Sequence, residues 1–280
     1  MPAEPILLIP DVHQDADFLL RCITAGQPHQ PGEIIFLEDL LDHKSRKGKT
    51  LPAIRQTLRI VDALIHESDI PVTLLWGNHD WKYWAAREEL AERAKDLNRN
   101  VEYFLNADLS VLTVDVLQEA DEKTGRVPFD LFERAILTVE KNGWLNSHAG
   151  VHSSLWPEAA NLTEGVQQLN EQMKTLLDEP SSDPRSALLG AGPSRGGFHP
   201  VGGPLWQDFF EEFTDDLPYP QIVGHTRCAE PAQKGRSYCL DACQRVCATL
   251  HPDGRLKPIF VKNDSGQATG GRRVVTPDIP

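Results

Sequence analysis

The first third of the chain alternates short apolar runs with stretches of helical periodicity. The apolar runs are rich in branched and aromatic residues and end at polar or turn-forming residues, which is typical of buried strands. Strands that alternate with helices predict parallel pairing through right-handed crossovers. The predicted strands are 5–9, 33–37 and 71–76, and the predicted helices are 15–25, 51–66 and 82–96.

The pattern along the rest of the chain is less regular. A strand is predicted at 106–116, a helix or an irregular connection at 129–141, and a further strand directly before residue 148. A helical pattern at 162–177 is followed by turn formers and by a glycine-rich loop at 190–203. The last predicted strands, which we expect to form an antiparallel meander with a turn at 252–254, are 237–241, 246–250 and 256–261.

The spread of these signals predicts one α/β domain over residues 1–262. Within it, we expect residues 152–215 to form an insertion at the rim of a substrate site, because long glycine-rich loops between strands often carry binding residues. The polar, glycine-containing tail at 263–280 is expected to be flexible.

Composition narrows the class of protein. Of the 280 residues, 40% are hydrophobic and 25% are charged, as in ordinary soluble proteins. The apolar runs fall far short of the ~20 residues that cross a bilayer, and the N-terminus lacks a signal-peptide pattern. We therefore expect a cytoplasmic protein without membrane association. The formal net charge of -13 repels polyanions, so no stable nucleic-acid binding is expected.

Five short motifs rich in metal-binding residue types follow or end the apolar runs. Each therefore lies where a buried strand meets a loop, which is where open α/β sheets collect their ligands. One such motif would be weak evidence, but five in succession indicate a shared centre. The motifs are Asp11-Val12-His13, Glu38-Asp39-Leu40-Leu41-Asp42, Gly77-Asn78-His79-Asp80, His148-Ala149-Gly150 and Gly224-His225-Thr226.

These residue types favour a centre with two metal ions. In an extended segment, Asp11 and His13 point to the same side and can bind one ion together. Asp39 has two oxygens and can bridge two ions at the ~3.5–4 Å separation of two-metal hydrolases. One ion would be bound by Asp11, His13 and Asp39, and the other by Asp39, Asn78, His148 and His225.

The donor set also indicates which ions and which chemistry to expect. Mixed oxygen and imidazole donors suit manganese, iron, zinc, cobalt or nickel better than calcium, and manganese is our first choice. Because Asn78 is neutral, two divalent ions, two carboxylates and one hydroxide sum to about +1, which attracts a phosphate. Two cations lower the pKa of a bridging water enough to supply hydroxide at neutral pH. His152 competes with His148 as a ligand, but we expect it at the rim or at the surface.

The order and spacing of the motifs resemble those of the calcineurin-like metallophosphoesterases over roughly residues 5–262. His148-Ala149-Gly150, the Gly224-His225-Thr226 step and Tyr238-Cys239-Leu240-Asp241 look most like the phosphoprotein phosphatase branch, which includes bacterial diadenosine tetraphosphatases. The resemblance implies a single-domain, four-layer α/β/β/α sandwich with mixed sheets.

His79 and Asp42 are assigned to acid catalysis. Asp42 lies three residues after Asp39 and can accept the ring N–H of His79, which keeps the imidazole basic enough to carry a proton. By resemblance, this pair is the acid dyad of the family. We expect a metal-bridging hydroxide to attack phosphorus while His79 protonates the departing alkoxide.

The candidate phosphate ligands are Asn78, His43 and Arg195. Phosphoprotein phosphatases usually have an arginine where this chain has His43, so Lys44 and Arg46 are candidates for its role. The missing arginine counts against protein-phosphatase activity more than against phosphoesterase activity. Arg195 resembles the family's phosphate-binding arginine, and its guanidinium could bind two phosphate oxygens. The alternative for Arg195 is a salt bridge within its loop.

Some residues depart from the family pattern or have no assigned role. Pro10, Gln14 and Glu38 stand where glycine is usual. We expect Glu38 to point away from Asp39, either behind the ligands or at the surface. The five cysteines are expected to be reduced, mostly buried thiols, with a metal or redox role as the alternative. Three tryptophans are expected to pack in the core rather than to stack on a base; they are Trp76, Trp81 and Trp84.

The motifs together predict a dinuclear phosphoesterase that hydrolyses phosphate monoesters, either protein phosphoserine and phosphothreonine or a small phosphorylated metabolite. Hydrolysis of a dinucleoside polyphosphate is the alternative substrate assignment. A catalytically inactive binding module of the same fold is the alternative of another class, and the presence of both His79 and Asp42 counts against it.

Overall fold

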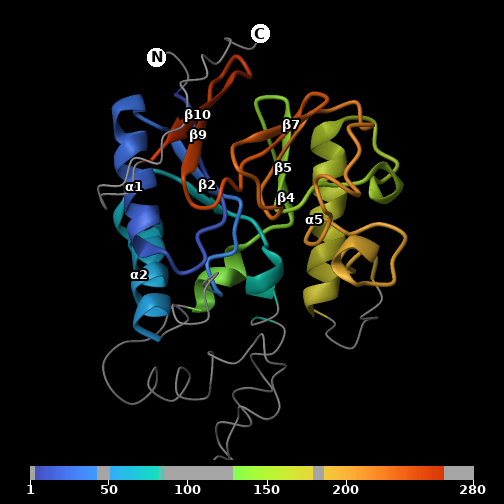
Figure 1. The fold of residues 1–280 in the computed structure, drawn as a ribbon, viewed down its shortest axis with the longest axis horizontal. Coiled ribbons are helices and arrows are strands. Elements are labelled where there is room, and N and C mark those ends of the chain that lie inside the picture. Colours follow the sequence, from blue (N-terminus) through green and yellow to red (C-terminus); the bar gives the residue numbers. More distant parts are fainter. Residues whose placement is uncertain (1–3, 43–50, 82–83, 85–128, 179–185, 262–280) are drawn as a thin grey trace, which may run out of the picture.

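The computed structural model describes residues 4–42, 51–81, 84, 129–178 and 186–261. Two five-stranded mixed sheets pack face to face, with helices α1 and α2 outside one sheet and α5 outside the other (Figure 1). This is the four-layer α/β/β/α arrangement expected for a single domain. The predicted segments 82–96 and 106–116 lie outside the described residues, except for Trp84.

The first sheet confirms the predicted parallel core. β1, β2 and β3 are parallel neighbours, and β9 joins the free side of β1 in the antiparallel direction. α1 (Ala16–Gly26), the short helix η1 (Gln27–His29) and α2 (Leu51–Glu67) connect or flank these strands. The strands in sheet order are β10 (Leu256–Phe260), β9 (Val246–Leu250), β1 (Ile6–Ile9), β2 (Glu33–Phe36) and β3 (Val72–Leu74).

The second sheet has β6 at its centre, parallel to β5 on one side and to β8 on the other. The outer strands β4 and β7 are antiparallel to their neighbours, and α5 (Leu162–Asp178) packs against β4. The strands in sheet order are β4 (Thr138–Lys141), β5 (Trp144–Ser147), β6 (Gln221–Val223), β8 (Ser237–Cys239) and β7 (Ala232–Lys234).

Two of the predictions for secondary structure are corrected. The strand predicted at 237–241 is β8 and belongs to the second sheet, because Cys239 pairs with Val223. Of the three strands predicted for the meander, only β9 and β10 pair with each other; they are antiparallel, with their turn at 252–254 as predicted. Residues 129–141 are neither one helix nor irregular, since η4 (Phe129–Arg134) is followed by β4.

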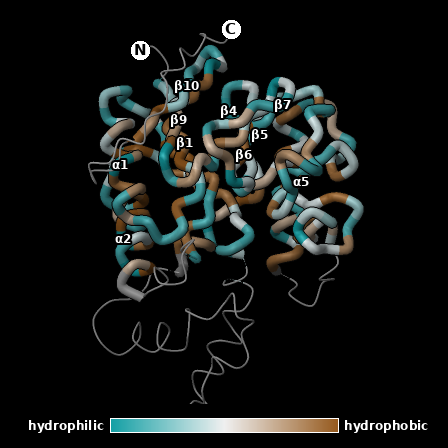
Figure 2. Tube along the Cα trace, in the orientation of Figure 1, coloured by the Kyte–Doolittle hydropathy of each residue, from teal (hydrophilic) through white to brown (hydrophobic). Residues whose placement is uncertain are grey.

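The four layers form because the central strands bury side chains on both faces of their sheet. Along β1, Leu7 and Ile9 face the cluster beneath α1 and α2, whereas Ile6 and Leu8 face the second sheet. A strand between two apolar layers reads as a continuous hydrophobic run. Figure 2 shows hydrophobic residues along β1, whereas hydrophobic and hydrophilic residues alternate along α1 and α2.

A long region connects β5 to β6. It contains α5 and two short helices, η5 (Ser153–Leu155) and η6 (Pro193–Arg195). No helix in the described ranges has both the length and the apolar character needed to span a bilayer.

Candidate metal centre

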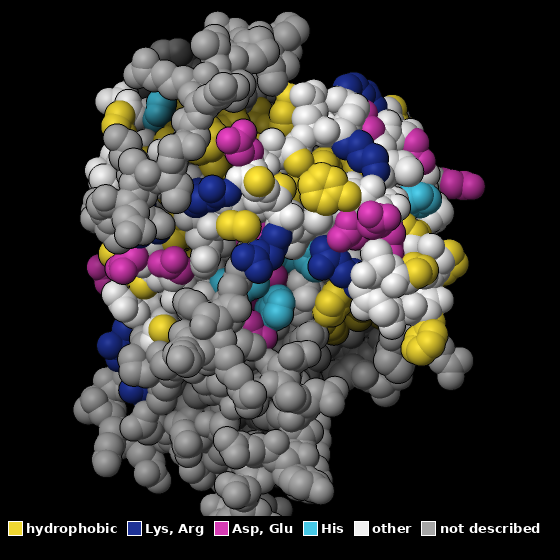
Figure 3. Space-filling model, in the orientation of Figure 1, with side chains coloured by type: hydrophobic (Ala, Val, Ile, Leu, Met, Phe, Trp, Pro, Cys, Tyr) yellow, Lys and Arg dark blue, Asp and Glu magenta, His cyan; other side chains and the backbone are white. Residues whose placement is uncertain are grey.

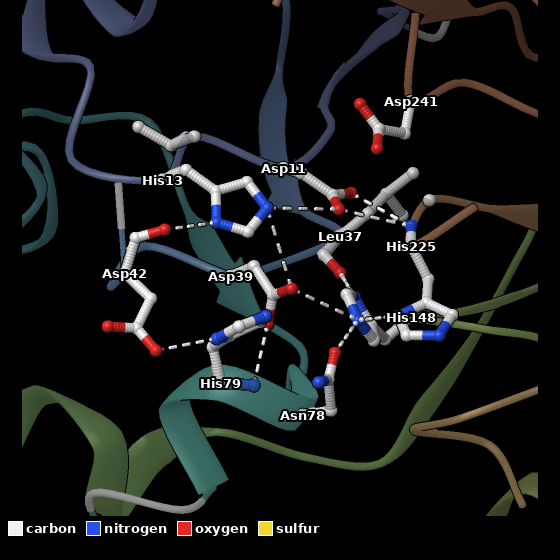
Figure 4. Close-up of polar contacts among 12 residues, drawn as sticks. Asp11, His13, Leu37, Asp39, Asp42, Asn78, His79, His148, His225 and Asp241 are labelled. Atoms are coloured by element: carbon white, nitrogen blue, oxygen red, sulfur yellow. Dashed lines mark hydrogen bonds and ion pairs between the residues drawn. The ribbon is translucent and has the colours of Figure 1, made fainter. Parts of the chain in front are cut away.

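The six predicted metal ligands lie together at the ends of the strands that precede them (Figure 4). Five of these side chains are buried and His225 is partly buried. They come from both sheets, because β1, β2 and β3 supply one side and β5 and β6 the other. The ligands are Asp11, His13, Asp39, Asn78, His148 and His225. On the face shown in Figure 3, histidine side chains lie between acidic and basic ones.

Asp11, His13 and Asp39 form the first group. His13 Nε2 lies 3.6 Å from Asp11 Oδ2 and 3.7 Å from Asp39 Oδ2. On the other side of its ring, His13 Nδ1 lies 2.7 Å from the carbonyl oxygen of Asp42. A proton on Nδ1 that is donated to this carbonyl leaves the Nε2 lone pair directed at the carboxylates, which is how metal-bound histidines are usually oriented.

The reason that Asp11 and His13 converge differs from the prediction. His13 has a φ of 48° and lies in a turn, so the segment is not extended through that residue. Its backbone N–H donates to the carbonyl of Asp39 at 2.6 Å. This contact between the two loops, and not side-chain alternation along a strand, brings His13 to the centre.

The second group is organised around His148. Its Nε2 lies 3.5 Å from Asp39 Oδ2, 3.0 Å from Asn78 Oδ1 and 3.1 Å from His225 Nδ1. Its Nδ1 lies 2.8 Å from the carbonyl of Leu37, which again directs Nε2 into the centre. Asp39 therefore belongs to both groups, as a bridging carboxylate must.

Two glycines allow the loops to approach this closely. A Cβ atom on Gly77 would lie 2.3 Å from Asp39 Oδ1, and one on Gly224 would lie 2.3 Å from Asp11 Oδ1. The residue after Gly224 donates its backbone N–H to that same carboxylate, since His225 N lies 3.0 Å from Asp11 Oδ1. Side chains at either glycine would push the carboxylates out of place.

His79 and Asp42 are paired as predicted. His79 Nδ1 lies 2.7 Å from Asp42 Oδ2, and the backbone N–H of His79 donates to Asp39 Oδ1 at 3.0 Å. A helix begins at Asn78, shortly after β3, so the side chain of His79 points in a different direction from that of Asn78. The His79 side chain is 29% exposed while Asp42 is 1% exposed, which leaves the imidazole accessible from solvent.

Asp80 has a supporting role that the sequence analysis did not assign. Its two carboxylate oxygens accept the backbone N–H groups of Leu40 at 3.0 Å and Leu41 at 2.9 Å. These bonds hold the loop between Asp39 and Asp42 against the helix that carries His79. The only signal in the sequence was the position of Asp80 directly after His79.

Burial dominates the electrostatics of the centre. It raises the pKa of Asp39 well above the ordinary range, an effect that the nearby His79 opposes and Asp11 reinforces. Burial also lowers the pKa of His225 well below its usual value, with His148 and Arg195 acting in the same direction. Two buried carboxylates beside imidazoles fit divalent cations, which would compensate the acidic charge.

Glu38 is not at the surface, which corrects one of the two expected placements. It is fully buried with a φ of 82°, a conformation that explains why glycine suits this position. Its carboxyl group interacts with that of the buried Asp80. Burial raises the pKa of Glu38 well above its usual value, and Asp80 raises it further.

Arg195 ends η6 at the edge of the centre. Its Nη2 lies 2.8 Å from Asp208 Oδ2 and 3.1 Å from the hydroxyl oxygen of Thr226, the residue after His225. The loop salt bridge that was the alternative for Arg195 is therefore present, and it holds the guanidinium beside the His225 loop. His43, Lys44 and Arg46 lie outside the described residues.

The remaining candidates behave largely as expected. His152 lies at the rim, where its ring contacts Ser154. Trp81 and Trp84 pack against the buried Trp76 in the first core cluster. All five cysteines are free and four are buried; only Cys243 is partly exposed.

Comparisons with known proteins agree with this geometry. A family model described as calcineurin-like phosphoesterase matches residues 4–227. No curated protein sequence matches the chain. Among solved structures, a cold-active protein-tyrosine phosphatase of the psychrophile Shewanella has a TM-score of 0.54 and 16% identity over 93% of this chain and 81% of that one. A point mutant of a cold-active protein tyrosine phosphatase has a TM-score of 0.53 with the same identity and coverage. The shared fold, the family match and the paired acidic and histidine groups lead to one conclusion: this chain belongs to the calcineurin-like phosphoesterases and is a metal-dependent phosphoesterase.

Proposed function

We propose that this chain hydrolyses phosphate monoesters at a centre of two metal ions. The observation that carries the proposal is the position of Asp39, whose Oδ2 lies 3.7 Å from His13 Nε2 and 3.5 Å from His148 Nε2. One carboxylate shared by two ligand groups is what a two-ion site requires. The residues that would hold the ions are Asp11, His13 and Asp39 for one, and Asp39, Asn78, His148 and His225 for the other.

The metal ions, of which manganese is the first choice and iron, zinc, cobalt or nickel also suit the donors, would supply positive charge and acidify bound water. Backbone groups of the chain orient two of the ligands. The carbonyls of Leu37 and Asp42 accept hydrogen bonds from Nδ1 of His148 and of His13, respectively. These bonds orient the imidazoles before an ion arrives.

His79 is proposed as the general acid. Asp42 Oδ2 lies 2.7 Å from its Nδ1, where a carboxylate stabilises a protonated ring, and the imidazole lies in one group with His13 and Asp39. In that state the ring can give its Nε2 proton to the leaving oxygen of an ester. Asn78 and Arg195 are the proposed contacts for the phosphate oxygens, and His43 remains a further candidate. A degenerate binding module would have no need of this intact acid pair.

The proposed substrates are phosphoserine or phosphothreonine in proteins, or a small phosphorylated metabolite. A panel on the manganese-loaded protein tests this: p-nitrophenyl phosphate, a phosphothreonine peptide, diadenosine tetraphosphate and a phosphotyrosine peptide. The last is included because the Shewanella structure is a protein-tyrosine phosphatase. Preference for the dinucleotide would replace our substrate assignment, and no turnover of any substrate would count heavily against the mechanism.

Metal binding is expected to stabilise the fold. At a free metal concentration of about 100 times Kd, one site contributes about 2.7 kcal/mol to the free energy of unfolding, which corresponds to roughly 5–10 °C in Tm for a chain of this size. Thermal denaturation of chelated and manganese-loaded protein measures the difference. Equal Tm values at saturating manganese would contradict a preformed site in the native state.

Arg195→Ala is expected to raise KM and lower kcat, because the phosphate would lose a charged donor at the edge of the centre. Steady-state kinetics measure both values. Arg255→Ala is the matched control, since Arg255 also pairs with a nearby aspartate, Asp253, but in the exposed β9–β10 turn. If Arg195 serves only its salt bridge with Asp208, its variant will have a lower Tm with wild-type kinetics.

A further inference from the structure

The loop that carries His225 is held from behind by a buried thiol. Cys239 Sγ lies 3.1 Å from the carbonyl oxygen of Gly224 and 3.1 Å from that of Thr226. These carbonyls flank His225 on both sides, and Cys239 is the last residue of β8, directly beside the end of β6. The S–H group of Cys239 therefore supports the backbone that presents a proposed metal ligand.

A second thiol lies against the first. Cys228 follows His225 by three residues, and its Sγ lies 3.1 Å from the carbonyl of Asp241 and 3.9 Å from that of Cys239. The two side chains hydrogen-bond each other and share a small apolar cluster with Phe209, Phe213 and Val223. Both sulfurs thus meet on the inner side of the same loop.

The two thiols differ in reactivity. The hydrogen bond with Cys239 lowers the pKa of Cys228, although burial acts in the opposite direction. Burial raises the pKa of Cys239 well above its usual value. Cys228 also retains 8% exposure, whereas Cys239 has none. Because the thiolate is the nucleophile, Cys228 is the thiol that an oxidant would reach first.

We propose that Cys228 and Cys239 form a disulfide in the presence of a peroxide, and that this bond displaces the His225 loop. The Cys228 thiol loses its proton, and the thiolate attacks one oxygen of hydrogen peroxide, which forms a sulfenic acid and releases hydroxide. The hydroxide takes up the lost proton and becomes the first water. The sulfur of Cys239 then displaces the sulfenic oxygen, which leaves as water, and the thiol proton of Cys239 goes to that oxygen. In total, two thiols and one peroxide give one disulfide and two waters.

The disulfide would remove the S–H donor that the two flanking carbonyls share. His225 has a φ of 64°, a conformation that a non-glycine residue adopts only when its surroundings hold it. Its N–H is also bonded to Asp11, so a shift of the loop would disturb two proposed ligands together. Only this consequence for metal binding rests on the proposed function; formation of the bond does not.

The chain contains a matched control pair. Cys22 and Cys247 also hydrogen-bond each other, and both are fully buried between α1 and β9 in the first sheet. They do not contact the His225 loop. Cys243 is the third thiol near the site, and its Sγ lies 3.5 Å from the carbonyl of Cys228. Cys243 is an alternative disulfide partner for Cys228, so the experiment must distinguish it from Cys239.

The first experiment oxidises metal-free protein with hydrogen peroxide and maps the products by trypsin digestion and mass spectrometry. Cleavage after Arg227, Lys234, Arg236 and Arg245 gives peptides 228–234 and 237–245, of which the second contains both Cys239 and Cys243. The mapping therefore uses the Cys243→Ser variant. We expect the two peptides to be linked, with dithiothreitol releasing them. Absence of the linked pair would overturn the proposal.

The second experiment titrates manganese into oxidised and reduced protein by calorimetry. We expect oxidation to weaken binding by roughly 10–100-fold, the usual effect of losing a group that orients a ligand. In Cys22→Ser, oxidation should still weaken manganese binding. In Cys228→Ser and Cys239→Ser, oxidation should leave manganese binding unchanged. Unchanged manganese binding in protein whose disulfide is confirmed would overturn the effect on the loop. Neither measurement depends on catalytic turnover. A failure of this proposal can therefore be distinguished from a failure of the proposed function in the substrate panel.

Discussion

Asp39→Asn is expected to abolish binding of both metals and reduce turnover to background. The amide can still accept the N–H of His79 at Oδ1, so the local backbone is preserved. It cannot supply the negative charge that the two ligand groups share. We expect the affinity for manganese to fall by at least roughly 100-fold, since losing a group that merely orients a ligand already costs roughly 10–100-fold.

Elemental analysis and manganese calorimetry measure this loss, with Asp253→Asn in the exposed β9–β10 turn as the control. Full metal occupancy in Asp39→Asn would rule out the bridge. The stability of the metal-free variant separates loss of ligand from unfolding. Because burial raises the folded-state pKa of Asp39, its protonated form stabilises the metal-free protein at low pH, and this stability is lost as pH rises through the raised value. In Asp39→Asn, the free energy of unfolding should not show this decline as pH rises.

His79→Asn is expected to lower kcat by roughly 10²–10⁴, the usual contribution of a general acid. The asparagine retains the backbone N–H that donates to Asp39, so both metals should remain bound. The loss should be greatest on a phosphothreonine peptide, whose alkoxide needs a proton. It should be smaller on p-nitrophenyl phosphate, because nitrophenolate leaves without one.

Steady-state kinetics on the two substrates test this difference, and elemental analysis checks the metal content. His152→Asn is the matched control, because His152 lies at the rim and contacts Ser154. An unchanged rate on the peptide would remove His79 from the role of acid. An equal loss on both substrates would instead indicate that His79 positions the substrate or a metal.

The sequence indicated which polar side chains converge more completely than the path of the backbone. The convergence of Asp11, Asp39 and His148 follows from a local rule, because each comes directly after a buried strand whose carboxyl end meets its neighbours. The β8 error arose because the sequence shows that Tyr238 and Cys239 form a strand but not which sheet they join. That choice depends on pairing with Val223, which lies far from Cys239 along the chain.

Burial of polar residues was harder to predict than their identity. Glu38 was expected either behind the ligands or at the surface. It is completely buried and has a positive φ, which no local pattern indicated. Arg195 was left between a phosphate contact and a salt bridge, and the structure shows the bridge to Asp208. Asp80 had no predicted role, because its partners Leu40 and Leu41 are backbone groups of another loop.

By itself the sequence determined which residue types stand at the ends of which strands, and hence the family and its metal-dependent chemistry. This was possible because strand runs and ligand motifs are local features. Only the tertiary structure decided that Asp39 lies between His13 and His148, and that Cys228 meets Cys239 behind His225. His148 reaches Asp39 through the packing of the two sheets, and Cys228 reaches Cys239 through the pairing of β6 with β8 within the second sheet. No pattern along the chain encodes either arrangement.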